Sequence, residues 1–412
     1  MKIKEKSTEE KVIRKYLLRL RQPRIKKKEN RYYIRGYKGT EVIIRTDHEI
    51  LKRIAYRRTC VKQVCIPGRY ETETKYIYTR KENRRSRPVI VPGIPTGSET
   101  AMPRAVRTVL HALSYGGIEV EASRKLADLK KMDPMRIFYR TLDAEVYNGD
   151  YKVPIRLFFP TEEDMENGAA SGKKPPVILF FHGGGWVTES VENYQRVCAR
   201  MAQSTGQIVA SVEYRLAPEY RFPVGLMDCY AAAKTFYTNR FLLNTDPSRI
   251  TLIGDSAGGN LAAALSLMAR DRGEFMPQQQ VLIYPAVNND YSEASPFPSV
   301  MENGSDFLLT RQKLCQYLDY YQSSEEDRQN PYFAPILEPD LSKQPRTLIL
   351  TAEFNPLRDE GEAYGRKLLE AGNEVEIHRI KDALHGFFAL GIKYYHVQES
   401  YTIINQFLKE NE

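Results

Sequence analysis

The most constraining feature of this chain is a twenty-residue stretch at 249–268, RITLIGDSAGGNLAAALSLM. Its first part, Ile250–Ile253, is apolar and largely β-branched, which predicts a buried strand. The part from Asn260 onward is rich in alanine and leucine, which predicts a helix. Between them lies the pattern G-x-S-x-G. A strand, a tight glycine-bounded turn and a helix would present the hydroxyl of the central serine at the carboxyl edge of a sheet. The stretch therefore predicts Ser256 as a nucleophile.

A second glycine motif follows another predicted strand. The G-x-S-x-G pattern alone also fits a glycine-rich turn whose serine caps a helix. However, the apolar run PVILFF at 176–181 leads directly into HGGGW at 182–186. Three consecutive glycines leave backbone N–H groups uncovered, as an oxyanion hole for a tetrahedral intermediate requires. The predicted donors are the N–H groups of Gly183, Gly184, Gly185 and Ala257.

Only one of the six histidines has the sequence context of a catalytic base. A serine hydroxyl is a weak nucleophile and needs a base within hydrogen-bond reach. His182 belongs to the glycine motif, and His378 lies within a strand pattern. His385 follows the last predicted strand and precedes the apolar run at 387–390. In hydrolases that contain this serine turn, the nucleophilic serine comes first along the chain, then the acid, then the histidine. We therefore predict that His385 is the base.

Strand and helix patterns alternate along most of the chain. An alternating pair at 142–147 and 151–159 predicts an antiparallel hairpin. After it, strands are predicted at 176–181, 207–213, 250–253, 280–284, 346–352 and 374–380, and helices at 192–203, 226–238 and 260–268. Such alternation requires a mainly parallel sheet that is covered by helices on both faces. The predicted fold class is therefore α/β.

Five ordered motifs resemble one known family. They are FFHGGGW at 180–186, EYRLAPEYRFP at 213–223, IGDSAGGNLAAAL at 253–265, TAEFNPLRDEGEAYGRKLLEAG at 351–372 and HGF at 385–387. Together they resemble the hormone-sensitive-lipase-like branch of the α/β-hydrolase carboxylesterases, from about residue 100 to the C-terminus. The resemblance implies an α/β-hydrolase fold and a serine carboxylesterase acting on short to medium acyl esters, with no metal or organic cofactor. Peptidase or thioesterase activity would use the same machinery.

The resemblance also implies roles for segments outside the nucleophile and base. Residues of about 100–135 and 287–340 would form a helical cap over the site, the second segment being rich in aromatic residues. Trp186 would line the substrate pocket or pack in the core. Arg215 and Glu219 would form a structural pair near the site.

The third catalytic position departs from the family pattern. Members of the family read D-P-L-R-D, and the first Asp is the acid that supports the histidine. Here residues 355–359 read N-P-L-R-D, so Asn355 occupies the acid position. An amide can orient His385 but cannot stabilise an imidazolium. In serine proteases the corresponding change costs about 10⁴ in turnover, or roughly 5 kcal/mol of barrier.

Four interpretations of Asn355 remain open. The enzyme works slowly with an amide in this position, or a neighbouring carboxylate replaces the acid. The carboxylates close in sequence are Asp359, Asp382 and Glu353, each of which also fits a structural role. Alternatively, the chain is a ligand-binding or sensor protein that no longer needs catalysis. Finally, the residue has been changed deliberately to give an inactive enzyme.

Charge divides the chain into two parts. Residues 1–100 carry a net charge of +17, whereas the remainder carries −8. We therefore predict a basic α+β extension at 1–97, with a hairpin at 32–46 and a proline-rich linker at 83–99, followed by the hydrolase domain at 98–412. The extension could bind nucleic acid, could dock on another anionic surface, or could be a solvated accessory domain.

The composition of the chain indicates the cellular compartment in which we expect the protein. The longest apolar runs are no longer than a strand, and the first residues, MKIKEKSTEEK, are charged, which predicts neither a membrane span nor a secretion signal. The five cysteines, at 60, 65, 198, 229 and 315, are widely spread and lack zinc-finger spacing. We therefore expect reduced thiols and a cytoplasmic protein.

Overall fold

The computed structural model describes residues 118–128, 139–167, 174–238, 243, 245–390 and 394–409, together with five short N-terminal strands. The chain divides into two compact units. One consists of residues 1–74 and 93–99, and the other of residues 75–92 and 100–412. The domain boundary near residue 97 stays a prediction.

The first unit contains a three-stranded antiparallel sheet of order β1-β2-β3. Its strands are β1 (Arg24–Lys28), β2 (Arg31–Arg35) and β3 (Glu41–Arg45). The pairing of β2 with β3 confirms the predicted hairpin, whereas β1 had not been predicted because its alternation is masked by consecutive lysines. A short antiparallel pair, β4 (Tyr76–Ile77) with β5 (Val89–Ile90), belongs to the second unit and places a strand in the segment predicted as linker.

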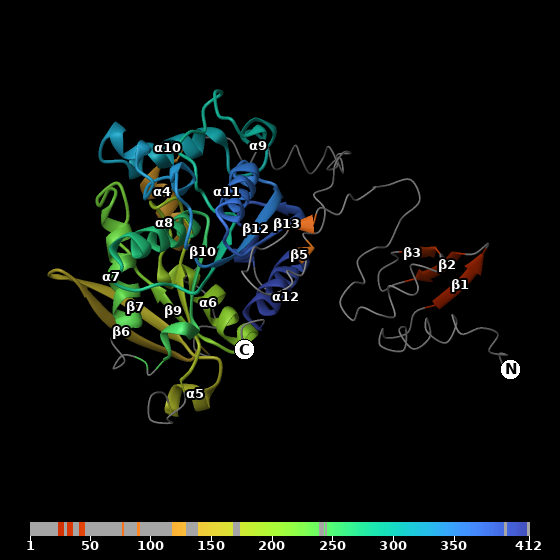
Figure 1. The fold of residues 1–412 in the computed structure, drawn as a ribbon, viewed down its shortest axis with the longest axis horizontal. Helices are drawn as coiled ribbons and strands as arrows, with labels where there is room; N and C mark the ends of the chain where they lie inside the picture. The colour runs from red at the N-terminus through yellow and green to blue at the C-terminus, as the bar shows by residue number, and fades with distance from the viewer. Residues whose placement is uncertain are drawn as a thin grey trace. The chain divides into compact units, whose positions relative to one another are not determined.

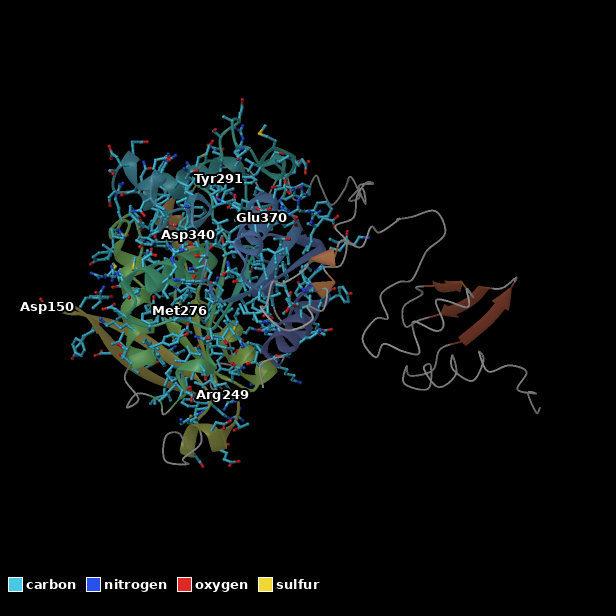
Figure 2. All side chains as sticks on the ribbon, viewed as in Figure 1. Asp150, Arg249, Met276, Tyr291, Asp340 and Glu370 are labelled. Carbon is cyan, nitrogen blue, oxygen red and sulfur yellow. The ribbon has the colours of Figure 1, made fainter. Side chains whose placement is uncertain are left out.

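An eight-stranded sheet organises the second unit, in the order β13-β12-β11-β10-β8-β9-β7-β6. The strands are β6 (Thr141–Asn148), β7 (Tyr151–Phe158), β8 (Val177–Phe181), β9 (Ile208–Val212), β10 (Ile250–Asp255), β11 (Gln279–Ile283), β12 (Arg346–Phe354) and β13 (Val375–Leu384). The strands from β13 to β9 pair in parallel, and β7 pairs antiparallel with both β6 and β9. Figure 2 shows Asp150 at the tip of the β6–β7 hairpin.

Helices cover both faces of this sheet (Figure 1). Helices α6 (Val191–Thr205) and α12 (Tyr395–Lys409) pack on one face, and α7 (Val224–Thr238), α8 (Ala257–Arg272) and α11 (Arg358–Glu370) pack on the other. Strand β8 shows why both faces need cover. Val177, Leu179 and Phe181 join one apolar cluster, while Ile178 and Phe180 join the other. The predicted α/β architecture is thereby confirmed.

Short elements complete the described part of the unit. They are α4 (Val120–Asp128), α5 (Glu162–Asn167), α9 (Pro298–Glu302), α10 (Arg311–Tyr321) and the 3-10 turns η4 (Pro247–Arg249), η5 (Glu325–Gln329), η6 (Pro335–Leu337) and η7 (Phe387–Leu390). The N–H of Ile118, just before α4, donates to Gln316 of α10 at 2.7 Å, and the Tyr320 hydroxyl donates to the carbonyl of Ile118 at 3.3 Å. The two predicted cap segments therefore touch, although much of 100–135 lies outside the described residues.

Arg215 and Glu219 do not pair with each other, contrary to the sequence expectation. Arg215 donates through Nε and Nη2 to the fully buried carboxylate of Asp228 on α7, at 2.9 and 2.8 Å. Glu219 is instead bound by Arg124 of α4 at 2.7 Å. The buried carboxylate on α7 needs a cation, and Arg215 supplies it. Glu219 remains at the surface, where α4 reaches it.

We expect Arg215→Gln to lower the free energy of unfolding by about 3 kcal/mol, because Asp228 is left buried without a cation. Arg311→Gln, which removes the partner of the largely exposed Glu293, should cost less than about 1 kcal/mol. Urea denaturation of the two variants beside the parent tests the difference. Equal losses would contradict the structural importance of the buried pair.

Candidate active site

Ser256 occupies a sharp turn between β10 and α8. Its backbone has φ 56° and ψ −118°, a combination that non-glycine residues rarely adopt. A Cβ atom at Gly258 would lie 1.9 Å from the carbonyl oxygen of Phe181, so only glycine allows α8 to approach β8 this closely. The Ser256 hydroxyl makes no capping hydrogen bond to α8. The alternative of a helix-capping serine therefore does not fit.

His385 lies directly beyond β13, against the serine turn. Its Nε2 is 3.0 Å from Oγ of Ser256, which is hydrogen-bond distance for a base and its nucleophile. The ring of Tyr284 packs beside the imidazole, with centroids 4.8 Å apart. Burial lowers the pKa of His385 to about 3. The opposite ring nitrogen, Nδ1, is buried and has no hydrogen-bond partner among the described residues.

The glycine motif supplies fewer oxyanion donors than the sequence predicted. The N–H of Gly183 donates to Oδ1 of Asp255 at 2.8 Å, so it is already engaged. Gly184 and Gly185 have φ values of 111° and 61°, and their N–H groups have no acceptor within the described residues. The N–H of Ala257, at the start of α8, is also without an acceptor there. Three of the four predicted donors are available to a developing oxyanion.

Asp255, which precedes Ser256, links the glycine motif to the serine turn by hydrogen bonds. Its carboxylate accepts hydrogen bonds from Gly183 and from the hydroxyls of Tyr194 at 2.9 Å and Tyr284 at 3.3 Å. Burial raises the pKa of Asp255 to about 6, although its three donors act in the opposite direction. These hydrogen bonds fix the shape of the turn before Ser256. The two tyrosines were missed because they come from α6 and from the residue after β11, with no local motif to mark them.

Aromatic residues of the cap pack against the glycine motif. Trp186 is 4% exposed and stacks on Tyr321 of α10, with ring centroids 4.4 Å apart and planes at 4°. This position fits the packing alternative for Trp186 rather than a pocket wall. Tyr317, also on α10, lies so close to Gly185 that a Cβ there would be 2.3 Å from its ring. The sequence had marked the segment that contains Tyr317 only as rich in aromatic residues.

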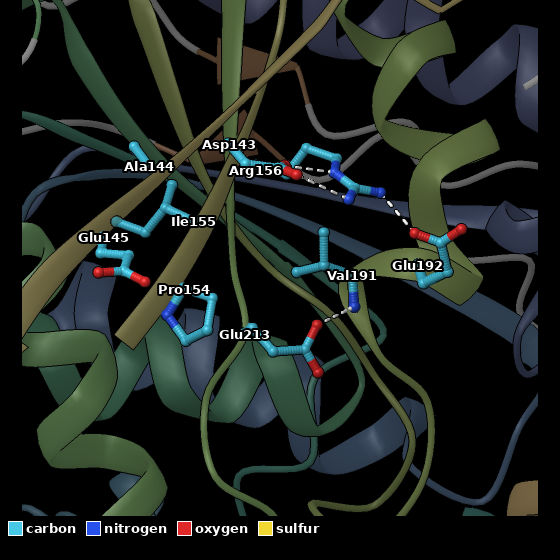
Figure 3. Close-up of a pocket in the computed structure, with 9 residues that line it drawn as sticks. All are labelled: Asp143, Ala144, Glu145, Pro154, Ile155, Arg156, Val191, Glu192 and Glu213. Carbon is cyan, nitrogen blue, oxygen red and sulfur yellow. Dashed lines mark hydrogen bonds and ion pairs between the residues drawn. The ribbon is translucent and has the colours of Figure 1, made fainter. Parts of the chain in front are cut away.

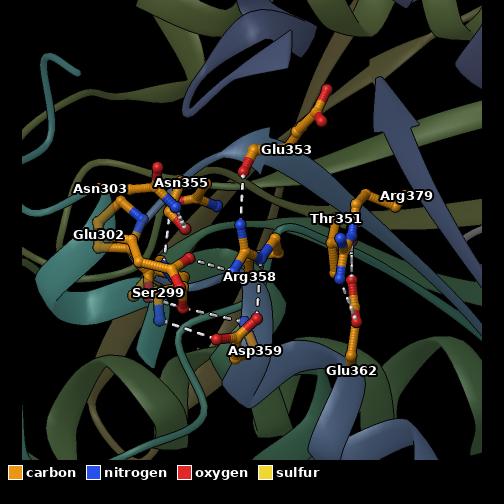
Figure 4. Close-up of polar contacts among 12 residues, drawn as sticks. Ser299, Glu302, Asn303, Thr351, Glu353, Asn355, Arg358, Asp359, Glu362 and Arg379 are labelled. Carbon is orange, nitrogen blue, oxygen red and sulfur yellow. Dashed lines mark hydrogen bonds and ion pairs between the residues drawn. The ribbon is translucent and has the colours of Figure 1, made fainter. Parts of the chain in front are cut away.

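Asn355 follows β12 and is fully buried. Its Oδ1 accepts the backbone N–H of Leu357 at 3.1 Å, and its backbone carbonyl accepts from Nδ2 of Asn303 at 3.3 Å (Figure 4). Its own Nδ2 is buried without a hydrogen-bond partner among the described residues. Asn355 and His385 therefore each have one buried nitrogen without a hydrogen bond among the described residues, Nδ2 and Nδ1 respectively.

The neighbouring carboxylates make contacts away from Nδ1 of His385. Asp359 accepts hydrogen bonds from Arg358 and from the backbone N–H of Ser299, each at 2.8 Å (Figure 4). Asp382 is exposed, and its N–H donates to Glu353 at 2.7 Å. Because Nδ1 of His385 lacks a partner among the described residues, no described carboxylate supports the imidazole in this conformation.

A separate cavity of about 430 Å³ lies between the β6–β7 hairpin and the start of α6 (Figure 3). Its lining residues are Asp143, Ala144, Glu145, Pro154, Ile155, Arg156, Val191, Glu192 and Glu213. Arg156 is already paired with Asp143 and Glu192, and Glu213 accepts the N–H of Val191. Ser256 and His385 do not line this cavity. It is therefore separate from the serine–histidine pair.

The described residues contain no group of three or more His, Cys, Asp or Glu side chains placed to hold a metal ion. Among the described helices, none is both long enough and apolar enough to cross a membrane.

Comparison with known proteins identifies the family. The model of a family described as the alpha/beta hydrolase fold matches residues 178–389. An arylesterase of Saccharolobus solfataricus is 34% identical over 271 residues, which are 66% of this chain and 83% of that protein. An ethyl acetate hydrolase of Pseudomonas putida is 33% identical over 262 residues, or 63% of this chain and 79% of that protein. The chain therefore belongs to the α/β-hydrolase fold family.

Solved structures agree with this assignment. A hyperthermophilic esterase from the archaeon Pyrobaculum calidifontis has 34% sequence identity and a TM-score of 0.66. The match covers 75% of this chain and 98% of the esterase. The remaining quarter of this chain has no counterpart in that match, and a quarter of the chain is long enough to contain the basic extension.

The raised pKa of Asp255 predicts a pH effect on stability. The folded state holds the proton of this carboxyl more tightly than the unfolded chain, whose pKa is 3.8. Stability from this group is therefore greatest below pH 4 and falls by about 3 kcal/mol as pH rises to 6. In Asp255→Asn that fall should disappear, whereas Asp150→Asn, at the hairpin tip, should behave like the parent. Unfolding free energies measured at several pH values test this, and parallel curves would contradict it.

Proposed function

We propose that the chain is a serine carboxylic ester hydrolase that works through an acyl-serine intermediate. The observation that carries this proposal is the 3.0 Å contact between Oγ of Ser256 and Nε2 of His385. Oγ attacks the ester carbonyl carbon while its proton passes to Nε2. The N–H groups of Gly184, Gly185 and Ala257 stabilise the negative oxygen of the tetrahedral intermediate.

The remaining steps use the same groups. His385 returns the proton to the departing alcohol oxygen, and the C–O bond to the alcohol breaks, which leaves the acyl group on Ser256. A water molecule then gives a proton to His385 and attacks the acyl carbon. Collapse of this second intermediate releases the carboxylic acid and returns the proton to Ser256. No step in this sequence requires a metal or an organic cofactor.

We propose esters with short to medium acyl groups and aryl or small alkyl alcohols as substrates. The support comes from relatives named arylesterase and ethyl acetate hydrolase. It also comes from the aromatic cap, where Tyr317 of α10 packs on the glycine motif. Thioester or peptide hydrolysis would use the same nucleophile, and parallel assays with a thioester and a peptide test these activities.

We further propose that Asn355 slows the reaction. A carboxylate here would use one oxygen for the N–H of Leu357 and would keep a second acceptor. Asn355 instead has an NH₂ donor, which cannot accept a proton held on Nδ1 of His385. The charge that develops on the imidazole during attack therefore lacks a counter-charge. A ligand-binding protein with this fold is the competing function, and the unpartnered Nδ1 is the observation that favours it.

The exchange Asn355→Asp should raise kcat at least about tenfold, because an aspartate restores both the tautomer and the counter-charge. Ser256→Ala should abolish hydrolysis. Asn405→Asp makes the same change of charge on α12 and should leave kcat unchanged. Initial rates with p-nitrophenyl acetate and butyrate measure these effects.

Two other results would change the conclusion. If Asn355→Asp has no effect and Asp359→Ala or Asp382→Ala abolishes turnover, a neighbouring carboxylate is the acid. If the parent hydrolyses none of the esters but Ser256→Ala binds them as tightly as the parent, the chain is a binding protein.

The lowered pKa of His385 predicts an unusual pH profile. The base must be neutral in the free enzyme, and burial holds its pKa at about 3. The parent's kcat/KM should therefore not fall between pH 7 and pH 5. If residue 355 holds the acid position as proposed, Asn355→Asp should raise the imidazole pKa, so the kcat/KM of this variant should begin to fall at a higher pH. Superimposable profiles, once scaled, would contradict the assigned electrostatics.

We propose the cytoplasm as the location of the protein. The support is the state of its described cysteines, since Cys198, Cys229 and Cys315 are all free thiols. Burial also raises the pKa of Cys198 to about 12, which keeps this thiol protonated and unreactive.

A further inference from the structure

The two faces of the N-terminal sheet differ in charge, as the register of its strands shows. In the β1–β2 pair, Lys26 lies opposite Tyr33, and in the β2–β3 pair Tyr33 lies opposite Ile43. Residues that lie opposite each other share a face, and faces alternate along each strand. One face therefore carries Arg24, Lys26, Lys28, Arg31, Tyr33, Arg35, Glu41, Ile43 and Arg45. We call these nine residues the basic face.

The opposite face has a different character. It carries Ile25, Lys27, Tyr32, Ile34, Val42 and Ile44. The opposite face therefore holds one cation among five apolar or aromatic residues, whereas the basic face holds six cations and one carboxylate.

We propose that the basic face binds single-stranded nucleic acid. Proteins that bind single strands combine cations along the backbone path with aromatic residues on which bases stack. Tyr33 lies at the middle of the central strand, between Arg31 and Arg35. Sheets that present aromatic residues on a central strand are a common platform for unpaired bases. This proposal is independent of the ester hydrolase activity.

Dimensions and charge favour this partner. Residues four apart on a strand are separated by about 14 Å, and three strands span about 10 Å, so the basic face covers several phosphates. Residues 1–100, which include the basic face, carry a net charge of +17, while the rest of the chain has −8, so an anionic partner is favoured at this end of the sequence. Adsorption to a membrane would need apolar residues to insert beside the cations. The basic face has only Ile43 for that purpose.

The full chain should bind a fluorescein-labelled mixed-sequence DNA or RNA of about 20 nucleotides, longer than the ~4–16 nucleotides that one small domain occupies. Fluorescence anisotropy between about 50 and 200 mM NaCl measures the salt dependence. With four or five phosphate contacts the slope of log K against log[salt] should be about −3. Absence of binding at the lowest salt would overturn the proposal.

The triple variant Arg24→Gln, Lys26→Gln, Arg35→Gln tests the position of the site. It should weaken binding at least about tenfold and reduce the slope by about 2, since each single-strand contact contributes roughly 0.7. The charge-preserving variant Arg24→Lys, Arg35→Lys should retain binding, which separates lost charge from a failure to fold. If the triple variant binds like the parent, the proposal is wrong.

A matched control changes the same charge elsewhere. Lys343, Lys381 and Lys409 are exposed on the hydrolase unit. Replacing all three with Gln should leave both the affinity and the slope unchanged. A loss equal to that of the N-terminal triple variant would mean that only net charge matters, and would overturn the proposal.

The role of Tyr33 distinguishes nucleic acid from other anions. Tyr33→Leu should weaken binding about tenfold because a base loses its stacking surface, whereas Tyr33→Phe should bind like the parent. Vesicles of phosphatidylcholine and phosphatidylserine are the second probe. If the parent sediments with these vesicles and does not bind the oligonucleotide, the basic face is a membrane surface and the proposal is overturned.

Discussion

The contact between Ser256 and His385 depends on the parallel order of the sheet. The two residues are 129 positions apart in sequence, yet one follows β10 and the other follows β13. Because β10 to β13 run in the same direction, their carboxyl ends meet at one edge. The fold therefore brings the proposed nucleophile and base together without any local motif that links them.

Much of the fold and the main site pair could be predicted from sequence, because both leave periodic or short-range signals. Buried strands read as apolar runs, and Ser256 sits in a turn that only a few residue types allow. Contacts between distant elements left no such signal. The engagement of Gly183 by Asp255 and the pairing of Arg215 with Asp228 follow from how loops and helices meet in space. Strand β1 was not predicted because its consecutive lysines interrupt the alternation of apolar and polar residues that indicates a strand.

Asn355 separates two functions that an aspartate would combine. An aspartate would shape the turn after β12 and, in the role proposed for this position, would also supply a negative charge to the imidazole. Asn355 keeps the first role through the hydrogen bond from Leu357. It lacks the second, and His385 is left with a buried, unpartnered nitrogen and a low pKa. The geometry of the nucleophile and base is thus maintained by packing, including Tyr284, rather than by a charge.

Tyr317 of α10 packs directly against the glycine motif, which contains two of the proposed oxyanion donors. Its ring fills the space beside Gly185 that a side chain would otherwise take, so α10 and the glycine motif form one packed unit. A bulky acyl group that pushed α10 outward would also remove the support of this loop. An acyl group that is too large would then lower kcat as well as weaken binding, because it would displace the backbone N–H groups proposed to stabilise its own transition state.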